Sequence, residues 1–225
     1  MELFGFTVKK KRPEQEIRSV IAPTPDDGSA VVNSAAAYYG LVVDLEGIIK
    51  NDADLIRRYR ESATYADCDQ AIEEIVNEAI VSDVDKPTVT LVLDDLKVSD
   101  AIKNKIRDEF DVVLKMYKFG VKSHDIFRQW YVDGRLYYHI ILDEKNPKNG
   151  IIELRFVDPR KIRKIKDIKK ERNDKGVEVM KTIEEYYLYN DKGITEQTTQ
   201  GVKMSVDSII LCTSGLIDAN TNMVL

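Results

Sequence analysis

The sequence predicts an α+β fold in which helices come first and a mostly antiparallel sheet follows. Two observations support this prediction. Between residues 51 and 134 apolar residues recur at helical spacing, as in the stripe from Ala71 to Ile80. From residue 135 onward, short β-branched and aromatic runs alternate with polar turns. We therefore divide the chain into an arm (1–50) and one domain (51–225) with a helical part (51–134) and a strand-rich part (135–225).

The arm combines a basic run with residues that favour turns. Lys9 to Arg12 precede a proline, and residues 22–28 contain two prolines and an Asp-Gly step. Residues 34–40 are low in complexity and have no periodicity. We expect only short ordered pieces here, held against other parts of the molecule.

Two helices and a strand are predicted in the next segment. Asn51 or Asp52 can cap a first helix, which breaks near residues 62–64. A second helix runs from about residue 67 to 81, with its acidic residues on the solvent side. The β-branched run 88–93 that follows Pro87 predicts a strand.

Two further helices complete the helical part. Ser99 is the expected cap of a helix from residue 100 to about 119, and Gly120 is the expected glycine after its end. Ser123 is a candidate cap of the last helix, which ends at residues 133–134.

Strands dominate the remainder of the chain. Residues 135–142 and 151–157 are separated by a polar, turn-rich loop, which predicts a hairpin. The segment 161–170 carries isoleucines three residues apart, a spacing that fits neither a regular strand nor a long helix. The other predicted strands cover 177–189, 193–199 and 206–212.

Composition excludes several classes of function. The net charge of −5 argues against a protein that mainly wraps nucleic acid. With two cysteines and two histidines, a zinc site would require all four to converge. Cys68 and Cys212 lie in apolar patterns and are expected to be small buried side chains, with a disulfide or a reactive thiol as the alternative. Nucleotide-binding and hydrolase motifs are absent from the sequence, and no apolar run has the length of a membrane span.

Two short groups of polar residues allow a catalytic interpretation. Asp94-Asp95 can be read as paired carboxylates for a metal-dependent phosphodiesterase, but we favour a polar turn before the next helix. Ser123-His124-Asp125 cannot form a triad by itself, because adjacent residues on a helix point in different directions. We expect no catalytic residue, metal or cofactor in this chain.

A basic stretch over residues 155–172 is the strongest candidate for contacts with a partner. It contains nine Lys or Arg residues against Asp158, Asp167 and Glu171. Such a run forms a solvated face, an interface with an acidic neighbour or a phosphate-binding surface. The strand tyrosines 137, 138, 186, 187 and 189 extend the last alternative to single-stranded nucleic acid, although tyrosines in strands are commonly core residues.

Six segments, in their order along the chain, resemble the portal vertex proteins of T4-like myoviruses, including those of cyanophages. The resemblance rests on IAPTPDDG at 21–28, LIRRYR at 55–60, DQAIEEIVNEAIV at 69–81, FRQWYVDGR at 127–135, ELRFVDPR at 153–160 and SGL at 214–216. Each string alone is weak, but six in the right order are specific.

The resemblance implies a structural subunit of a dodecameric ring at one capsid vertex, used for head assembly, DNA packaging or ejection, and neck attachment. Its implied partners are other copies of itself, the major capsid protein, the terminase large subunit, neck proteins and viral double-stranded DNA. It implies location in the virion, with assembly in the host cytoplasm. Family members are longer, so we expect an N-terminal fragment with the arm and wing, lacking stem, clip and crown. The rival hypothesis is a nucleic-acid-binding module that uses the basic stretch and the tyrosines.

A ring also suggests a use for the uneven charge. Subunits in a ring meet through two different faces, and an acidic helical part beside a basic strand-rich part suits such contacts. The candidate interface residues are Arg155, Arg160, Lys161, Arg163 and Lys164.

Overall fold

The computed structural model describes residues 2–3, 6–7, 29–32, 45–81, 88–143, 145–146, 150–172, 178–194 and 201–216. Within these residues the long helices precede the long strands, which confirms the predicted α+β class. The helices are α1 (Leu45–Ser62), α2 (Ala66–Ala79), α3 (Asp100–Tyr117) and α4 (Phe119–Asp133).

The described strands form two main sheets. The first has the order β5 (Ile151–Val157), β4 (Arg135–Leu142) and β9 (Ile209–Thr213), with antiparallel pairing throughout. The second has the order β3 (Ala30–Val32), β6 (Ile162–Arg172), β7 (Glu178–Tyr189) and β8 (Val202–Ser205). Only the β3–β6 pairing is parallel among these neighbours. A separate pair joins β1 (Glu2–Leu3) to β2 (Phe6–Thr7).

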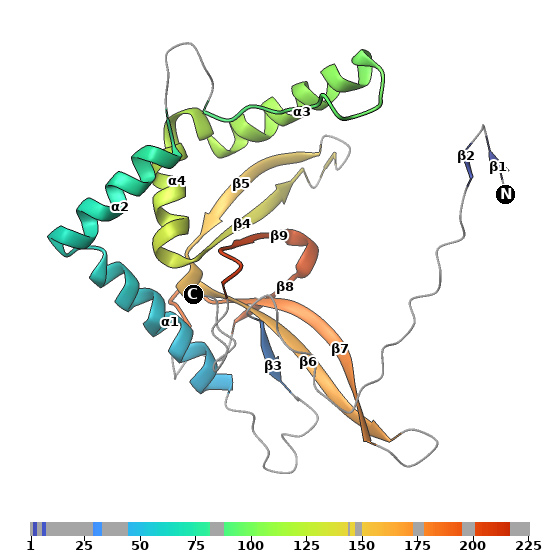
Figure 1. Ribbon diagram of the computed structural model, residues 1–225. Coiled ribbons are helices and arrows are strands. Elements are labelled where there is room, and N and C mark those ends of the chain that lie inside the picture. Colours follow the sequence, from blue (N-terminus) through green and yellow to red (C-terminus); the bar gives the residue numbers. More distant parts are fainter. Residues whose placement is uncertain are drawn as a thin grey trace.

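Helices α3 and α4 cover one face of the first sheet, the second sheet packs on its other face, and α1 lies beside β3 of the second sheet (Figure 1). Alternation along β4 produces this arrangement, because successive side chains of a strand point to opposite faces. Leu136 and Tyr138 pack towards Ile126 and Trp130 of α4. Tyr137, between them, packs in the cluster that joins the sheets; the other buried members of that cluster are Ile162, Tyr187 and Ile209.

Helix α1 begins earlier than the sequence predicted. Asn51 and Asp52 lie inside the helix and do not cap it. In the sequence, Leu45, Ile48 and Ile49 extend the helical spacing of apolar residues upstream of position 51, which accounts for the longer helix. The predicted break after residue 62 and the second predicted helix are confirmed.

The junction between α3 and α4 also differs from the prediction. Ser99 takes the expected N-cap position, with extended backbone and no side-chain capping bond. The turn at the other end of α3 is made by Lys118, whose φ of 53° is left-handed. Gly120 therefore lies in the first turn of α4, and Ser123 is buried inside that helix. The predicted end at Asp133 is confirmed, with Gly134 at φ 69° as the C-cap.

The hairpin of β4 and β5 matches the predicted strands residue for residue. The strand β7 is also confirmed, and the ambiguous segment 161–170 is the strand β6. Its spacing of three arises because both faces are covered: Ile162 packs against the first sheet, whereas Ile165 packs with Ala30 of β3 and Leu188 of β7.

Other predictions are wrong or only partly right. Residues 88–93 form bends and irregular structure, with no strand partner among the described residues. The predicted strand 206–212 is a short 3-10 helix over 206–208 followed by β9. Most of 193–199 lies outside the described residues. Cys68 and Cys212 are exposed thiols, because each lies at the edge of the apolar pattern that suggested burial.

Candidate functional site

The five candidate interface residues do not form one free cationic surface. Arg155 on β5 is exposed and pairs with Glu153 at 2.9 Å. Lys161 pairs with Asp191 at 3.1 Å, and the ammonium of Lys164 lies 3.6 Å from a Glu185 oxygen.

The other two candidates are arginines that differ in exposure. The guanidinium of Arg160 binds the Asp158 carboxylate at 2.7 Å. Arg163 is only 3% exposed, so its charge cannot meet a neighbouring molecule. The sequence revealed the basic residues but not the carboxylates that lie beside them.

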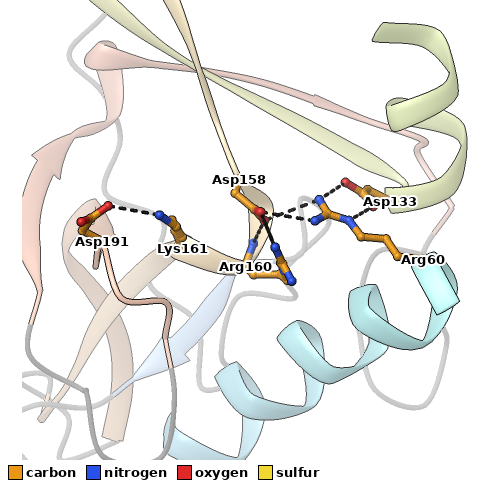
Figure 2. Close-up of polar contacts among 6 residues, drawn as sticks. All are labelled: Arg60, Asp133, Asp158, Arg160, Lys161 and Asp191. Carbon is orange, nitrogen blue, oxygen red and sulfur yellow. Dashed lines mark hydrogen bonds and ion pairs between the residues drawn. The ribbon is translucent and has the colours of Figure 1, made fainter. Parts of the chain in front are cut away.

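The pair of Arg160 and Asp158 belongs to a partly buried charge network that joins the helices to the sheets (Figure 2). Arg60, in the last turn of α1, binds Asp133 in a bidentate manner, with Nε donating at 2.8 Å and Nη2 at 2.6 Å. Its Nη1 also donates to Asp158 at 3.3 Å. Asp158 in turn accepts from the backbone N–H of Arg160 at 2.9 Å, which caps the 3-10 helix Pro159–Lys161.

The local structure explains why this network needs Arg60. Asp133 is the last residue of α4, where the partial negative charge of the helix end disfavours a carboxylate. Its side chain is only 2% exposed, so water cannot offset that cost. The bidentate guanidinium supplies both the countercharge and two hydrogen bonds. The positive charge of Arg60 is itself stabilised by the partial negative charge at the C-terminal end of α1.

The network also holds Asp158 in its charged form. Burial alone would raise the pKa of this carboxyl. The hydrogen bonds from the Arg160 side chain and backbone, with the charges of Arg60 and Arg160, outweigh burial and lower the pKa from 3.8 to about 2. The hydrogen bond to Asp133 raises the pKa of Arg60 above its ordinary value, against the opposing effect of burial.

A second group of charges joins α2 to α4. Arg128 donates from Nε to Glu73 at 2.8 Å and also pairs with Asp69. His124 lies 3.1 Å from the side-chain oxygen of Asn77. Part of the face of α2 expected to contact solvent therefore contacts α4.

These two groups connect most of the strings that carry the family resemblance. Arg60 comes from LIRRYR, Asp133 from FRQWYVDGR and Asp158 from ELRFVDPR. The SGL string joins them, because the backbone N–H of Ser214 donates to the carbonyl of Gly134 at 2.7 Å. The strings were visible in the sequence, but their contact with one another was not.

The structure supports none of the catalytic interpretations. Asp94 and Asp95 lie in an exposed turn, and Ser123 is buried while its neighbour His124 contacts Asn77. Within the described ranges no group of three or more His, Cys, Asp or Glu side chains is placed to hold a metal ion. No helix in the same part of the chain is long and apolar enough to cross a membrane.

Burial also removes most of the proposed stacking surface. Tyr137, Tyr138 and Tyr187 are core residues. Burial, with smaller contributions from Tyr117 and Cys212, raises the pKa of Tyr138 to about 12. Tyr186 is partly exposed but is covered on one side by the Lys203 ammonium, 4.1 Å from the ring centroid. The nucleic-acid-binding alternative therefore loses most of its aromatic platform.

Residues 52–225 match the family described as Bacteriophage T4-like portal protein (Gp20). The chain is similar to the portal protein of Vibrio phage KVP40, with 37% identity over 227 residues, covering 92% of this chain and 43% of the relative. It is also similar to the portal protein of Salmonella phage ViI, with 31% identity over 165 residues, covering 73% of this chain and 29% of the relative. The chain thus spans less than half the length of either relative.

Proposed function

We propose that this chain, which belongs to the family of T4-like bacteriophage portal proteins, is a structural subunit of the ring at the capsid vertex. The observation that carries the proposal is the family match over residues 52–225. The charge network supports it, because the similar strings are the ones that hold α1, α4 and the sheets together. Their role is to fix the shape of the subunit.

The proposal extends to the assembly around the subunit. The partners are other copies of the chain in a dodecamer, the major capsid protein, the terminase large subunit, neck proteins and viral double-stranded DNA. The location is the virion, after assembly in the host cytoplasm. The subunit acts without catalytic residues or cofactors. Residues 1–50 serve as an arm, whose strand β3 pairs with β6, and residues 51–225 as the wing domain; α1 (Leu45–Ser62) crosses this boundary and joins the two.

The exposed part of the basic stretch serves as a contact surface in this assembly. Arg155, Arg160 and Lys161 reach solvent, whereas Arg163 is buried and Lys164 is largely covered. Each exposed cation already has a carboxylate partner within the chain. These residues therefore help to orient the subunit against its neighbour and add little to the affinity between them.

Native mass spectrometry and negative-stain microscopy of the 225-residue chain test the proposal directly. We expect closed rings or the smaller oligomers from which they form. A chain that stays monomeric across the accessible concentration range, under conditions where it is folded, would contradict self-assembly through these residues.

A further inference from the structure

An apolar groove lies between the helices α1, α2 and α4. It has a volume of about 600 Å³ and is open to solvent. The end of α1, the start of α2 and the end of α4 form its walls, and its lining includes Tyr59, Cys68, Ile72, Trp130 and Leu216. This volume is within the range of sites that hold a ligand or several aliphatic side chains.

A row of acidic residues borders the groove. Helix α2 contains five Asp or Glu residues and no Lys or Arg. Arg128 pairs with two of them, Asp69 and Glu73. The exposed Asp67, Glu74 and Glu78 are spaced by seven and four residues, so they form one row beside the groove-lining stripe of Cys68 and Ala71. An apolar occupant with basic flanks would complement this surface.

Residues 97–107, which we call the basic α3 segment, have that chemistry. They carry Lys97, Lys103, Lys105 and Arg107 against Asp100 alone. Ile102 lies on the apolar face of α3 and is 48% exposed. The chain just before the segment adds Val92, which is 74% exposed. The segment therefore offers an exposed apolar side chain together with several cations.

The basic α3 segment projects from the rest of the subunit. No residue of α3 is buried, and the α3 residues that pack on a core cluster, Met116 and Tyr117, lie at its other end. Figure 1 shows the N-terminal end of α3 pointing away from the junction of α1 and α2, where the groove lies. The segment therefore cannot occupy the groove of its own chain.

We propose that the basic α3 segment of one subunit docks into the apolar groove of the next, with its lysines beside the acidic row of α2. This inference rests on the proposed function, because it specifies the partner as a second copy of this chain. A projection on one face and a groove on another make a head-to-tail contact, which closes into a ring when the rotation between subunits permits.

Native Cys68 gives a direct test, because it is exposed and lines the groove. In a Cys212→Ser background, Ile102→Cys adds a thiol to the basic α3 segment. If this segment docks in the groove of the next copy, mild oxidation should join the added thiol to Cys68 of that copy. The test is specific because a disulfide requires Cα atoms within about 7 Å of each other. Each copy would carry both thiols, so a non-reducing gel should show a ladder of dimers, trimers and larger species. The rate should fall when salt rises from about 0.05 M to about 0.5 M.

Two control variants decide the interpretation. Asn104→Cys places a thiol on the opposite face of the same helix and should give no ladder. Ile102→Cys with Cys68→Ser should also give none. Equal ladders from positions 102 and 104, or a dimer that persists without Cys68, would overturn the inference.

Assembly of the unmodified chain separates this inference from the proposed function. If native mass spectrometry shows oligomers but Ile102→Cys gives no ladder, the groove is not the contact and the ring subunit remains. If neither appears, both proposals fail.

A second variant, Ile102→Asp, should weaken association about tenfold or more while leaving the thermal unfolding curve unchanged, because the side chain is exposed within one chain.

Discussion

Lys118 makes the turn between α3 and α4 in a conformation that suits glycine better than lysine. Its φ of 53° brings Cβ close to the following carbonyl oxygen, a strain of roughly 1–2 kcal/mol for an L-residue. Lys118→Gly is expected to raise the free energy of unfolding by up to about 1 kcal/mol, since the strain relieved exceeds the entropy cost of glycine. Urea unfolding measures the change.

Lys122→Gly is the matched control, because Lys122 is exposed in the interior of α4. Glycine at that position should lower the free energy of unfolding by about 1 kcal/mol. If both substitutions destabilise the chain equally, the left-handed conformation of Lys118 carries no strain worth relieving.

The carboxylate of Asp158 makes the stability of the fold depend on pH. Its pKa falls from 3.8 to about 2 on folding, because the opposing effect of burial is outweighed by Arg160 and Arg60. The folded state is therefore stabilised above about pH 4, and this stabilisation is lost as the pH falls towards 2. Asp158→Asn should be less stable at pH 7 and show a flatter decline between pH 4 and pH 2.

Thermal unfolding at several pH values compares the two profiles. Asp95→Asn, in an exposed turn, should follow the wild-type curve. A wild-type slope in Asp158→Asn would mean that other carboxylates account for the acid sensitivity.

The link between α1 and α4 should respond unequally to removal of its two partners. Arg60→Met leaves the nearly buried Asp133 carboxylate without its bidentate donor and should cost about 3 kcal/mol or more. Asp133→Asn should cost only about 1–2 kcal/mol, because the Arg60 side chain is 33% exposed and keeps Asp158. The free energies of unfolding in urea give both values.

A double-mutant cycle completes this test. The double variant should cost clearly less than the sum of the single variants, because the interaction is already lost in each. Arg57→Met, which breaks an exposed pair one turn earlier in α1, should change stability by under about 0.5 kcal/mol. Additive costs, or a larger cost for Asp133→Asn, would show that the pair does not couple the helices.

Elements whose pattern is local could be predicted from the sequence. Arg135–Leu142 and Ile151–Val157 were correct to the residue, because both are continuous β-rich runs bounded by turns. The strand from Ile162 was ambiguous, because burial on both faces removes the alternation that identifies a half-exposed strand. The end of α3 was missed, since nothing in its sequence distinguishes Lys118 from a helical lysine.

In the candidate site, too, the local features could be predicted from the sequence and the tertiary contacts could not. Its basic residues are contiguous in the sequence and were predicted, whereas their partners come from distant elements. Lys161 meets Asp191 across a span of thirty residues, and Arg60 meets Asp133 across seventy-three. Because pairing over such spans is set by the tertiary fold, the sequence alone could not show that these charges are largely neutralised within the chain.

The sequence indicated an acidic helical part beside a basic strand-rich part, but in the structure charges of both signs are paired across these two parts. The acidic helical part and the basic strand-rich part are joined by pairs such as Arg60–Asp158, which leave less charge for partners. The acidic row of α2 and the basic α3 segment carry charges of opposite sign, and both lie within the helical part. The polarity relevant to assembly therefore lies within the helical part as well as between the two parts.

Reversing the exposed charges of the basic stretch tests its role in assembly. Arg155→Glu with Lys161→Glu is expected to weaken oligomerisation at about 0.05 M salt, because both side chains reach solvent, and to have less effect near 1 M, where the Debye length is about 3 Å. Lys145→Glu, in the exposed connection between β4 and β5, is the control. Arg163 is unsuitable, because its side chain is only 3% exposed and its reversal would test folding and not association. Sedimentation at both salt concentrations measures the effect, and equal association of variant and wild type at low salt would remove the basic stretch from the interface.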